Sequence, residues 1–211
     1  MNKVIAFIDG FNLYHSLVAA GLHDLKWINY WNLADAFVKK QKEQLIKVFY
    51  FSALANWDKE KADRHRNYIR ALESANVEVI LGKFKRVTKT CRADCRKEYK
   101  TFEEKETDIN IAVTMLLEAA NNTFDKALLF SADSDMIAGI RALKKMAPDK
   151  DIQVVIPYGR NSEDLEQCCH YVSRVNLRHL KRNQFPPIIT LKNGSTIEKP
   201  ASWTLAGDEK K

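Results

Sequence analysis

Acidic residues stand at three places in the sequence where an α/β fold would bring them together. Asp9 directly follows the hydrophobic run VIAFI, and Asp133 and Asp135 come just after the hydrophobic run KALLFS. Asp108 stands near the start of an apolar helical segment, in the stretch EEKETDINIA. The carboxyl ends of parallel strands lie at one edge of a sheet. We therefore expect these side chains to meet in one crevice if the two strands are neighbours.

The chemistry of such a crevice follows from its charge. Three or four carboxylates without Lys or Arg between them repel one another, so the cluster requires a cation. Ligation by oxygen atoms alone favours a hard divalent ion, Mg²⁺ or Mn²⁺. A hard ion in basic surroundings is typical of sites where metal-activated water attacks a phosphodiester.

Each acid also has a purely structural interpretation. Asp9 can form a local Asx turn, with Asn12 capping the following helix. Asp108 can stabilise a helix N-terminus through the helix dipole, and Asp133 or Ser134 can cap the next helix. For each acid taken alone, the sequence leaves both interpretations open. The joint occurrence of the acids favours a metal site.

Strand-like and helix-like segments alternate along the 211 residues. This alternation predicts an α/β fold with a mostly parallel central sheet of about five to six strands and helices on both faces. Near-continuous apolar strands fit burial on both sides of that sheet. The predicted strands are 4–8, 45–52, 77–81, 126–131 and 152–156, and the predicted helices are 11–20, 32–42, 58–74, 107–120, 135–146 and 162–170.

Two segments depart from this alternation. Residues 84–104 are basic, contain Cys91 and Cys95, and show no clean period, which indicates an inserted loop or small hairpin. The stretch ITLKNGSTIEKP places Asn-Gly between two β-prone runs and predicts a hairpin. We therefore predict a main domain over residues 1–182 and a C-terminal hairpin or tail over 183–211.

Positive charge is concentrated rather than spread evenly. The net charge is +7, with 34 Lys and Arg against 27 Asp and Glu. This balance serves general solubility, but local clusters favour a polyanionic partner such as RNA. Arg160, in YGRNSED after the last predicted strand, is a further candidate phosphate contact, with a solvent-exposed turn as the alternative. The expected substrate contacts in the basic segment are Lys85, Arg86, Arg96 and Lys97, and a second basic group comprises Arg174, Arg178, His179, Lys181 and Arg182.

The four cysteines allow two interpretations. Cys91 and Cys95 have a spacing found among zinc ligands, and Cys168, Cys169 and His170 would have to complete the site. Adjacent cysteines rarely ligate one ion together in good geometry. Reduced thiols in a cytosolic protein are the alternative.

The general class is an ordinary globular chain. Hydrophobic residues make up 45% and charged residues 29% of the sequence. Because there is no apolar run of the roughly 18 residues that span a bilayer, and no signal-peptide pattern at the start, we expect a cytoplasmic protein without a membrane partner. The sequence leaves open whether the chain forms a homo-oligomer.

The ordered set IDGFN, EEKETDINIA and SADSD resembles the NYN domain, a branch of the PIN-like ribonuclease superfamily. The resemblance extends through IQVVIPYGRNS to KPASW and implies a Rossmann-like fold with acidic residues at the strand ends. Ala132 stands where the family usually has Gly, which raises the question of a turn with positive φ, and Glu106 stands where Gly or Gln is usual. The family's acidic and polar positions fall on Asp9, Asn12, Glu104 with Lys105, Asp108, Asp133 and Asp135.

The resulting hypothesis is an RNA-cleaving enzyme that depends on Mg²⁺ or Mn²⁺. Asn12 would orient a water or phosphate oxygen, with help from Ser131, and Lys105 would contact substrate or stabilise developing charge. The alternative is a non-catalytic module that binds RNA or a protein partner. A phosphatase of the haloacid-dehalogenase type does not fit, because DGFNL lacks the second Asp of D-x-D-x-T. The proposed metal ligands are Asp9, Asp108, Asp133 and Asp135.

Overall fold

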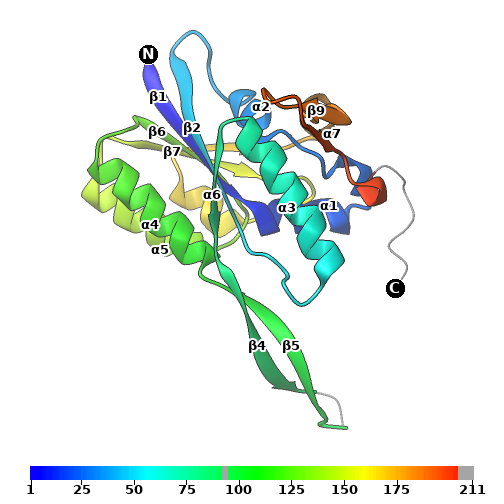
Figure 1. Cartoon of the computed structure of the whole chain (residues 1–211). Coiled ribbons are helices and arrows are strands. Elements are labelled where there is room, and N and C mark those ends of the chain that lie inside the picture. Colours follow the sequence, from blue (N-terminus) through cyan, green and yellow to red (C-terminus); the bar gives the residue numbers. More distant parts are fainter. Residues whose placement is uncertain (92–94, 204–211) are drawn as a thin grey trace.

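A six-stranded sheet with every neighbouring pair parallel forms the centre of the computed structural model, which describes residues 1–91 and 95–203 (Figure 1). The strand order is β3-β2-β1-β6-β7-β8, and helices cover both faces, so the predicted α/β class is confirmed. The strands are β1 (Asn2–Asp9), β2 (Glu43–Ser52), β3 (Val77–Leu81), β6 (Lys126–Phe130), β7 (Asp151–Ile156) and β8 (Tyr171–Arg174), and the helices are α1 (Gly10–Ala19), α2 (Tyr30–Asp35), α3 (Lys59–Ser74), α4 (Thr107–Ala120), α5 (Met136–Met146), α6 (Glu163–Cys168) and α7 (Leu177–Arg182).

Strand β1 shows why the sheet carries two cores. Its side chains alternate between faces, as the pleat of a strand requires. Ala6 and Ile8 join a cluster with α1, α2 and α3, whereas Ile5 and Phe7 join one with α4, α5 and α6. All four side chains are fully buried, which explains why the run is apolar without interruption.

The chain order of the central strands places the acidic motifs next to each other. Strand β1 pairs directly with β6, with Ile8 opposite Phe130, so the two strands are neighbours as the sequence argument required. Asp9 and Ser131 therefore leave the sheet side by side at its carboxyl edge. Helices α1 and α5 start from that same edge.

The basic segment forms a two-stranded antiparallel hairpin that projects from the body (Figure 1). Its strands are β4 (Lys83–Thr90) and β5 (Glu98–Lys105). The prediction of an inserted loop or small hairpin over 84–104 is thus resolved as a hairpin, and β5 leads through Glu106 directly into α4.

The predicted C-terminal hairpin is also present. It consists of β9 (Ile188–Thr190) and β10 (Thr196–Glu198), followed by a 3₁₀ turn, η2 (Ala201–Trp203). Ile197 and Trp203 belong to the same buried cluster as α3. The division of the chain after residue 182 remains a prediction, and the described C-terminal residues pack on the main body.

Some elements differ from the sequence-based expectation. The helix predicted over 32–42 is only six residues long, Tyr30–Asp35, and turns follow it up to β2. A short 3₁₀ helix, η1 (His23–Leu25), precedes it. The sequence pattern does not predict the short edge strand β8, because Ser173 and Arg174 make up half of it and leave no continuous apolar run. Within the described residues, no helix is both long and apolar enough to span a membrane.

The unusual backbone conformation lies at Glu106, not at Ala132. Glu106 has φ of 82°, in the left-handed region, whereas Ala132 is not among the residues with positive φ. The family's usual Gly is therefore not needed for φ at Ala132. A left-handed non-Gly residue costs roughly 1–2 kcal/mol, which the tight turn from β5 into α4 imposes here.

We expect Glu106→Gly to raise the free energy of unfolding by roughly 0.5–1 kcal/mol, because relief of the backbone strain exceeds the added entropy of the unfolded chain. The corresponding rise in melting temperature is about 1–4 °C for a chain of this size. Glu106→Gln is the control, since it removes the ion pair with Lys83 but keeps the strained φ. A Gly variant that melts below the Gln variant would contradict the strain argument.

Candidate active site

A cavity of about 380 Å³ opens at the carboxyl edge of the sheet, between the hairpin base, α1 and α4. It receives acidic side chains from the ends of β1, β5 and the β6–α5 turn, and from the first turn of α4. The residues that line it are Asp9, Phe11, Asn12, His15, Glu104, Thr107, Asp108, Ala132, Asp133, Arg160 and Asn161.

Asp9 is the most buried carboxylate of this site. Its side chain is only 4% exposed, accepts a hydrogen bond from the Asn12 backbone N–H at 3.0 Å and one from the Ser131 hydroxyl at 2.9 Å. The pKa of Asp9 is raised to about 6, mainly by burial; the charges of Asp108 and Asp133 contribute to the rise, and the two hydrogen bonds oppose it. The cap interpretation is thus correct for the backbone contact, but the second oxygen faces β6 rather than the helix.

Hydrogen bonds connect the β1–α1 and β6–α5 turns. Asn12 Oδ1 accepts from the Ala132 backbone N–H at 3.1 Å, and Ser131 Oγ accepts from the Asp133 N–H at 3.0 Å. Asp133 Oδ1 accepts in turn from the Asp135 N–H at 3.0 Å. These bonds fix the directions of Asp9 and Asp133, so Asn12 and Ser131 act as positioning residues for the carboxylates.

The start of α4 contributes Asp108 and brings Glu104 beside it. Glu104 Oε1 accepts from the Thr107 backbone N–H at 3.0 Å and caps the helix in place of Glu106. The pKa of Asp108 is raised to about 6, mainly by burial, with a further contribution from the charges of Asp133, Glu104 and Asp135. The helix dipole would lower this pKa. The repulsion between acids and the burial therefore dominate over the structural role that the sequence left open.

The donor atoms fit a hard divalent cation in type. Asp9, Asp108, Asp133 and Glu104 offer oxygen alone, and the hydroxyl of buried Thr107 has no hydrogen-bond partner among the described residues. Within the described chain, however, no three His, Cys, Asp or Glu side chains are already close enough to hold an ion. Small side-chain movements would have to accompany binding.

Asp135 and Lys105, both expected at the site, are not among the residues that line the cavity. Asp135 is exposed and borders a neighbouring hollow with Arg141 and Asp164. Lys105 Nζ lies 3.0 Å from Glu103 Oε2, on the side of β5 opposite to Glu104. Asp135 still acts on the site through its charge and its backbone N–H, whereas Lys105 has no such contact.

Arg160 is the described cation that lines the cavity, as the sequence suggested for a phosphate contact. It faces His15, whose pKa is lowered by burial and by the Arg160 charge. The cavity thus has an acidic wall and one basic edge, an arrangement suited to a metal-bound phosphate.

The hairpin divides its basic residues between two faces. Opposite residues in an antiparallel pair point to the same side, and successive residues alternate. Arg86 pairs with Phe102, and Thr88 pairs with Lys100, on the face that continues from Glu104 and the cavity. We call this the inner face of the hairpin; it comprises Phe84, Arg86, Thr88, Thr90, Glu98, Lys100, Phe102 and Glu104.

Of the predicted basic contacts, Lys85 lies on the outer face of the hairpin. Lys85 pairs with Glu103 in register, and Glu103 also binds Lys89 at 2.7 Å and Lys105 at 3.0 Å. These cations hold the pKa of Glu103 down at about 2. Arg96 and Lys97 lie beyond the strands, in the exposed connection at the hairpin tip.

The cysteines do not assemble into the four-ligand zinc site that the sequence allowed. Cys91 and Cys95 lie together at the hairpin tip, where hydrogen bonds from the Lys97 backbone and Cys91 lower the pKa of Cys95. Cys169 is part of the body, where burial raises its pKa to about 11. His170 Nδ1 accepts from the Ile152 backbone N–H. Over residues 1–91 and 95–203, no third His, Cys, Asp or Glu joins the pair at the tip.

Sequence reasoning missed part of the cavity wall. The family resemblance includes Glu104 together with Lys105 but does not place it among the ligands, although alternation along a strand ending at residue 105 puts Glu104 on the opposite side from Lys105. The only sequence feature that could have indicated Thr107 is its position as the first residue of a helix that begins among acidic residues. No local pattern marked His15 and Asn161, because they reach the site only through the packing of α1 and the loop after β7.

The raised pKa of Asp108 predicts how the stability of the metal-free protein depends on pH. Because its folded pKa, about 6, lies above the ordinary value of 3.8, its stabilising effect is full below about pH 4 and is lost as pH rises through 6. Asp108→Asn should therefore match the wild type near pH 4 in EDTA and melt higher at pH 7. Buried His65 titrates in both proteins and cancels in this difference.

The same comparison in saturating Mn²⁺ should reverse the order at pH 7, because the wild type binds the ion more tightly. Measured melting temperatures from pH 4 to 8, with and without Mn²⁺, test both signs. A constant difference across this range would mean that Asp108 does not carry the shifted pKa.

Comparison with known proteins places this geometry in a family. A family model described as NYN domain matches residues 3–176. Among solved structures, a protein of unknown function from Vibrio parahaemolyticus aligns with a TM-score of 0.56 and 18% identity over 83% of this chain and 94% of that chain, which shows the shared fold. A search of curated proteins finds no match. Since the family match spans most of the chain, including every carboxylate of the cavity, the chain belongs to the NYN domain family.

Proposed function

We propose that this protein is a ribonuclease that cleaves RNA phosphodiester bonds with the help of Mg²⁺ or Mn²⁺. The observation that carries the proposal is the convergence of Asp9, Asp108 and Asp133 on one cavity, with the pKa values of Asp9 and Asp108 raised to about 6. Such an unfavourable concentration of acid is typical of functional sites. Membership in the NYN family supports a nuclease.

Asp9, Asp108 and Asp133 are the proposed metal ligands, with Glu104 as a fourth carboxylate and Asp135 acting at longer range. Mg²⁺ or Mn²⁺ at this position would supply Lewis-acid stabilisation and activate a water molecule. Asn12 and Ser131 hold the carboxylates in place. Arg160 would bind a phosphate oxygen, while Lys105 is proposed only as a more distant contact because it pairs with Glu103.

The alternative, a module that binds RNA or protein without cleavage, also has a specific observation in its favour. The described carboxylates are not drawn together into a preformed metal site. In a binding module the acids would affect stability alone. The two proposals differ in whether the bound RNA is cleaved when a divalent ion is present.

The deciding experiment incubates the purified full chain with unstructured single-stranded RNA in Mn²⁺, Mg²⁺ or EDTA. We expect cleavage with a divalent ion and none in EDTA. Ion binding is measured separately by calorimetry. Binding of RNA without cleavage in any ion would support the module and reject the enzyme, whereas cleavage that persists in EDTA would reject the metal-dependent mechanism.

A further inference from the structure

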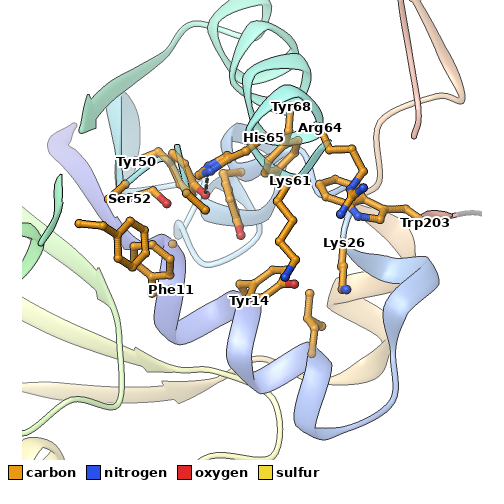
Figure 2. Close-up of a pocket in the computed structure, with 16 residues that line it drawn as sticks. Phe11, Tyr14, Lys26, Tyr50, Ser52, Lys61, Arg64, His65, Tyr68 and Trp203 are labelled. Atoms are coloured by element: carbon orange, nitrogen blue, oxygen red, sulfur yellow. Dashed lines mark hydrogen bonds between the residues drawn. The ribbon is translucent and has the colours of Figure 1, made fainter. Parts of the chain in front are cut away.

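A second cavity, of about 150 Å³, lies beside the acidic cavity and has the opposite character. It is formed by α1, α2, the end of β2, α3, the base of the hairpin and the C-terminal turn η2 (Figure 2). We call it the aromatic pocket, because its walls include the rings of Phe11, Tyr14, Tyr30, Tyr50, Tyr68, Phe84 and Trp203.

The rings form a rigid wall of the size that a flat ligand requires. Tyr30 and Tyr50 stack with centroids 5.3 Å apart, and Tyr68 packs edge-on against Trp203 at 5.4 Å. Both Tyr50 and Tyr68 are 4% exposed, and the Tyr68 hydroxyl donates to the Ile28 carbonyl at 2.7 Å. A cavity of about 150 Å³ with apolar walls is known to accept a single aromatic ring.

Polar groups at the wall give the pocket hydrogen-bonding capacity. The Tyr50 hydroxyl lies 3.3 Å from His65 Nε2 (Figure 2). Burial lowers the pKa of His65 to about 4, so its imidazole is neutral at physiological pH, with one donor and one acceptor nitrogen, of which Nε2 is shared with Tyr50. Tyr50 and His65 therefore suit a ligand with a neutral, amide-like edge better than one with a charged ring.

The charges around the pocket are positive. Lys26 is 4% exposed and its Nζ lies 4.9 Å from the centroid of the Tyr14 ring. In Figure 2, Lys61 and Arg64 extend from α3 towards Tyr14 and Trp203. Among the described lining residues there is no Asp or Glu.

The ion pairs that Lys61 and Arg64 already make are weak ones. Lys61 lies 3.4 Å from Asp58 and Arg64 lies 3.7 Å from Glu60, and Glu60 is 90% exposed. Exposed pairs of this kind contribute little to stability, so an anionic ligand can compete for both cations.

The aromatic pocket and the acidic cavity meet at one residue. Phe11, in the first turn of α1, lines both. Phe84 stands edge-on to it at 5.6 Å and continues the wall onto the hairpin's inner face. A chain with alternating bases and phosphates could therefore occupy both cavities at once.

From these contacts we infer that the aromatic pocket binds one unpaired nucleobase of a single-stranded RNA, with Lys61 and Arg64 on the adjoining phosphate, next to the bond cleaved in the acidic cavity. The choice of RNA as the source of the nucleobase rests on the proposed ribonuclease function. Aromatic walls accept any base by stacking, and cations at the rim accept its phosphate. A free nucleotide has the same chemistry and is the other source of the ligand.

The first test measures binding without catalysis. The full chain in EDTA is titrated with uridine 5′-monophosphate or adenosine 5′-monophosphate, and binding is followed by NMR. Ribose 5-phosphate is the probe without a base. We expect the nucleotides to bind and to shift signals of the pocket, with ribose 5-phosphate binding at least 5-fold more weakly. Equal binding of ribose 5-phosphate would reduce the pocket to a phosphate site and overturn the proposal.

Matched variants show whether this pocket is responsible. Lys61→Gln with Arg64→Gln should weaken nucleotide binding roughly 10-fold, whereas Lys59→Gln with Arg66→Gln removes the same charge from α3 outside the pocket and should not. Tyr14→Leu should weaken binding and Tyr14→Phe should retain it. Equal losses in the two double variants would overturn the assignment.

The second test uses RNA with one base removed at each position in turn. We expect the cleavage rate to fall roughly 5- to 150-fold when the missing base is within one or two nucleotides of the cleaved bond. Tyr14→Leu should make that position less sensitive. Cleavage that tolerates every missing base would overturn the subsite but leave the ribonuclease proposal intact. Nucleotide binding without cleavage of any RNA would reject the ribonuclease and leave a free-nucleotide site.

Discussion

Asp108→Asn should lower RNA cleavage by about 10²–10³-fold, because it removes one of the charges that hold the ion and stabilise the developing negative charge. The substitution keeps the shape of the side chain at the start of α4. Affinity for Mn²⁺ should fall in parallel, since Asp108 faces Asp133 and Glu104 across the cavity. Single-turnover rates and Mn²⁺ titrations provide the measurements.

Asp149→Asn is the matched control for this substitution. Asp149 is exposed and pairs with Lys150 just before β7, at the opposite edge of the sheet. The same loss of one charge there should leave the rate unchanged. Asp135→Asn should fall between the two, because Asp135 affects Asp108 by its charge but does not line the cavity. If Asp108→Asn cleaves as fast as the wild type, its proposed role as a ligand is wrong.

Removal of charge from the inner face of the hairpin should weaken RNA binding by roughly 10- to 30-fold at 0.1 M salt. Arg86→Gln and Lys100→Gln together remove two contacts that continue the line of the cavity along the RNA. The slope of log K against log salt should fall by about 1.4, at 0.7 for each lost single-strand contact. Fluorescence anisotropy with a labelled RNA, over a series of salt concentrations, gives both quantities.

The outer face supplies the control with equal charge. Lys85→Gln and Lys89→Gln lie on the side of Glu103, which already engages Lys89 and Lys105. We expect a clearly smaller loss of affinity and a smaller change of slope. Equal effects from the two pairs would mean that RNA contacts the hairpin without preference for a face.

The sequence alone determined five of the six strands of the central sheet, and the family. Strands buried on both faces are apolar at nearly every position, so β1, β6 and β7 stand out without knowledge of their partners. Acids placed directly after such strands predicted a shared crevice, and the pairing of β1 with β6 is consistent with it. The basic segment and the Asn-Gly turn were recognisable as separate units because their patterns are local.

Only the tertiary structure decided which side chains share a cavity. Alternation puts Glu104 and Lys105 on opposite sides of β5, and Arg86 and Lys85 on opposite sides of β4, but only the packing of the hairpin base decides that Glu104 lies on the side of the cavity. Asp133 and Asp135 are two residues apart, yet hydrogen bonding at the turn directs one into the cavity and leaves the other outside.

The aromatic pocket could not be predicted from the sequence either, because it also depends on how distant segments pack together. Its rings come from α1, α2, β2, α3, β4 and the C-terminal turn, from Phe11 to Trp203. In each segment, Tyr and Trp have the pattern of ordinary core residues. The burial pattern of a helix or strand can be read from residues a few positions apart. A pocket forms where segments that are distant in the sequence leave a space between them. The strands and their acids could therefore be predicted from local rules, but the shape of the space between the segments could not.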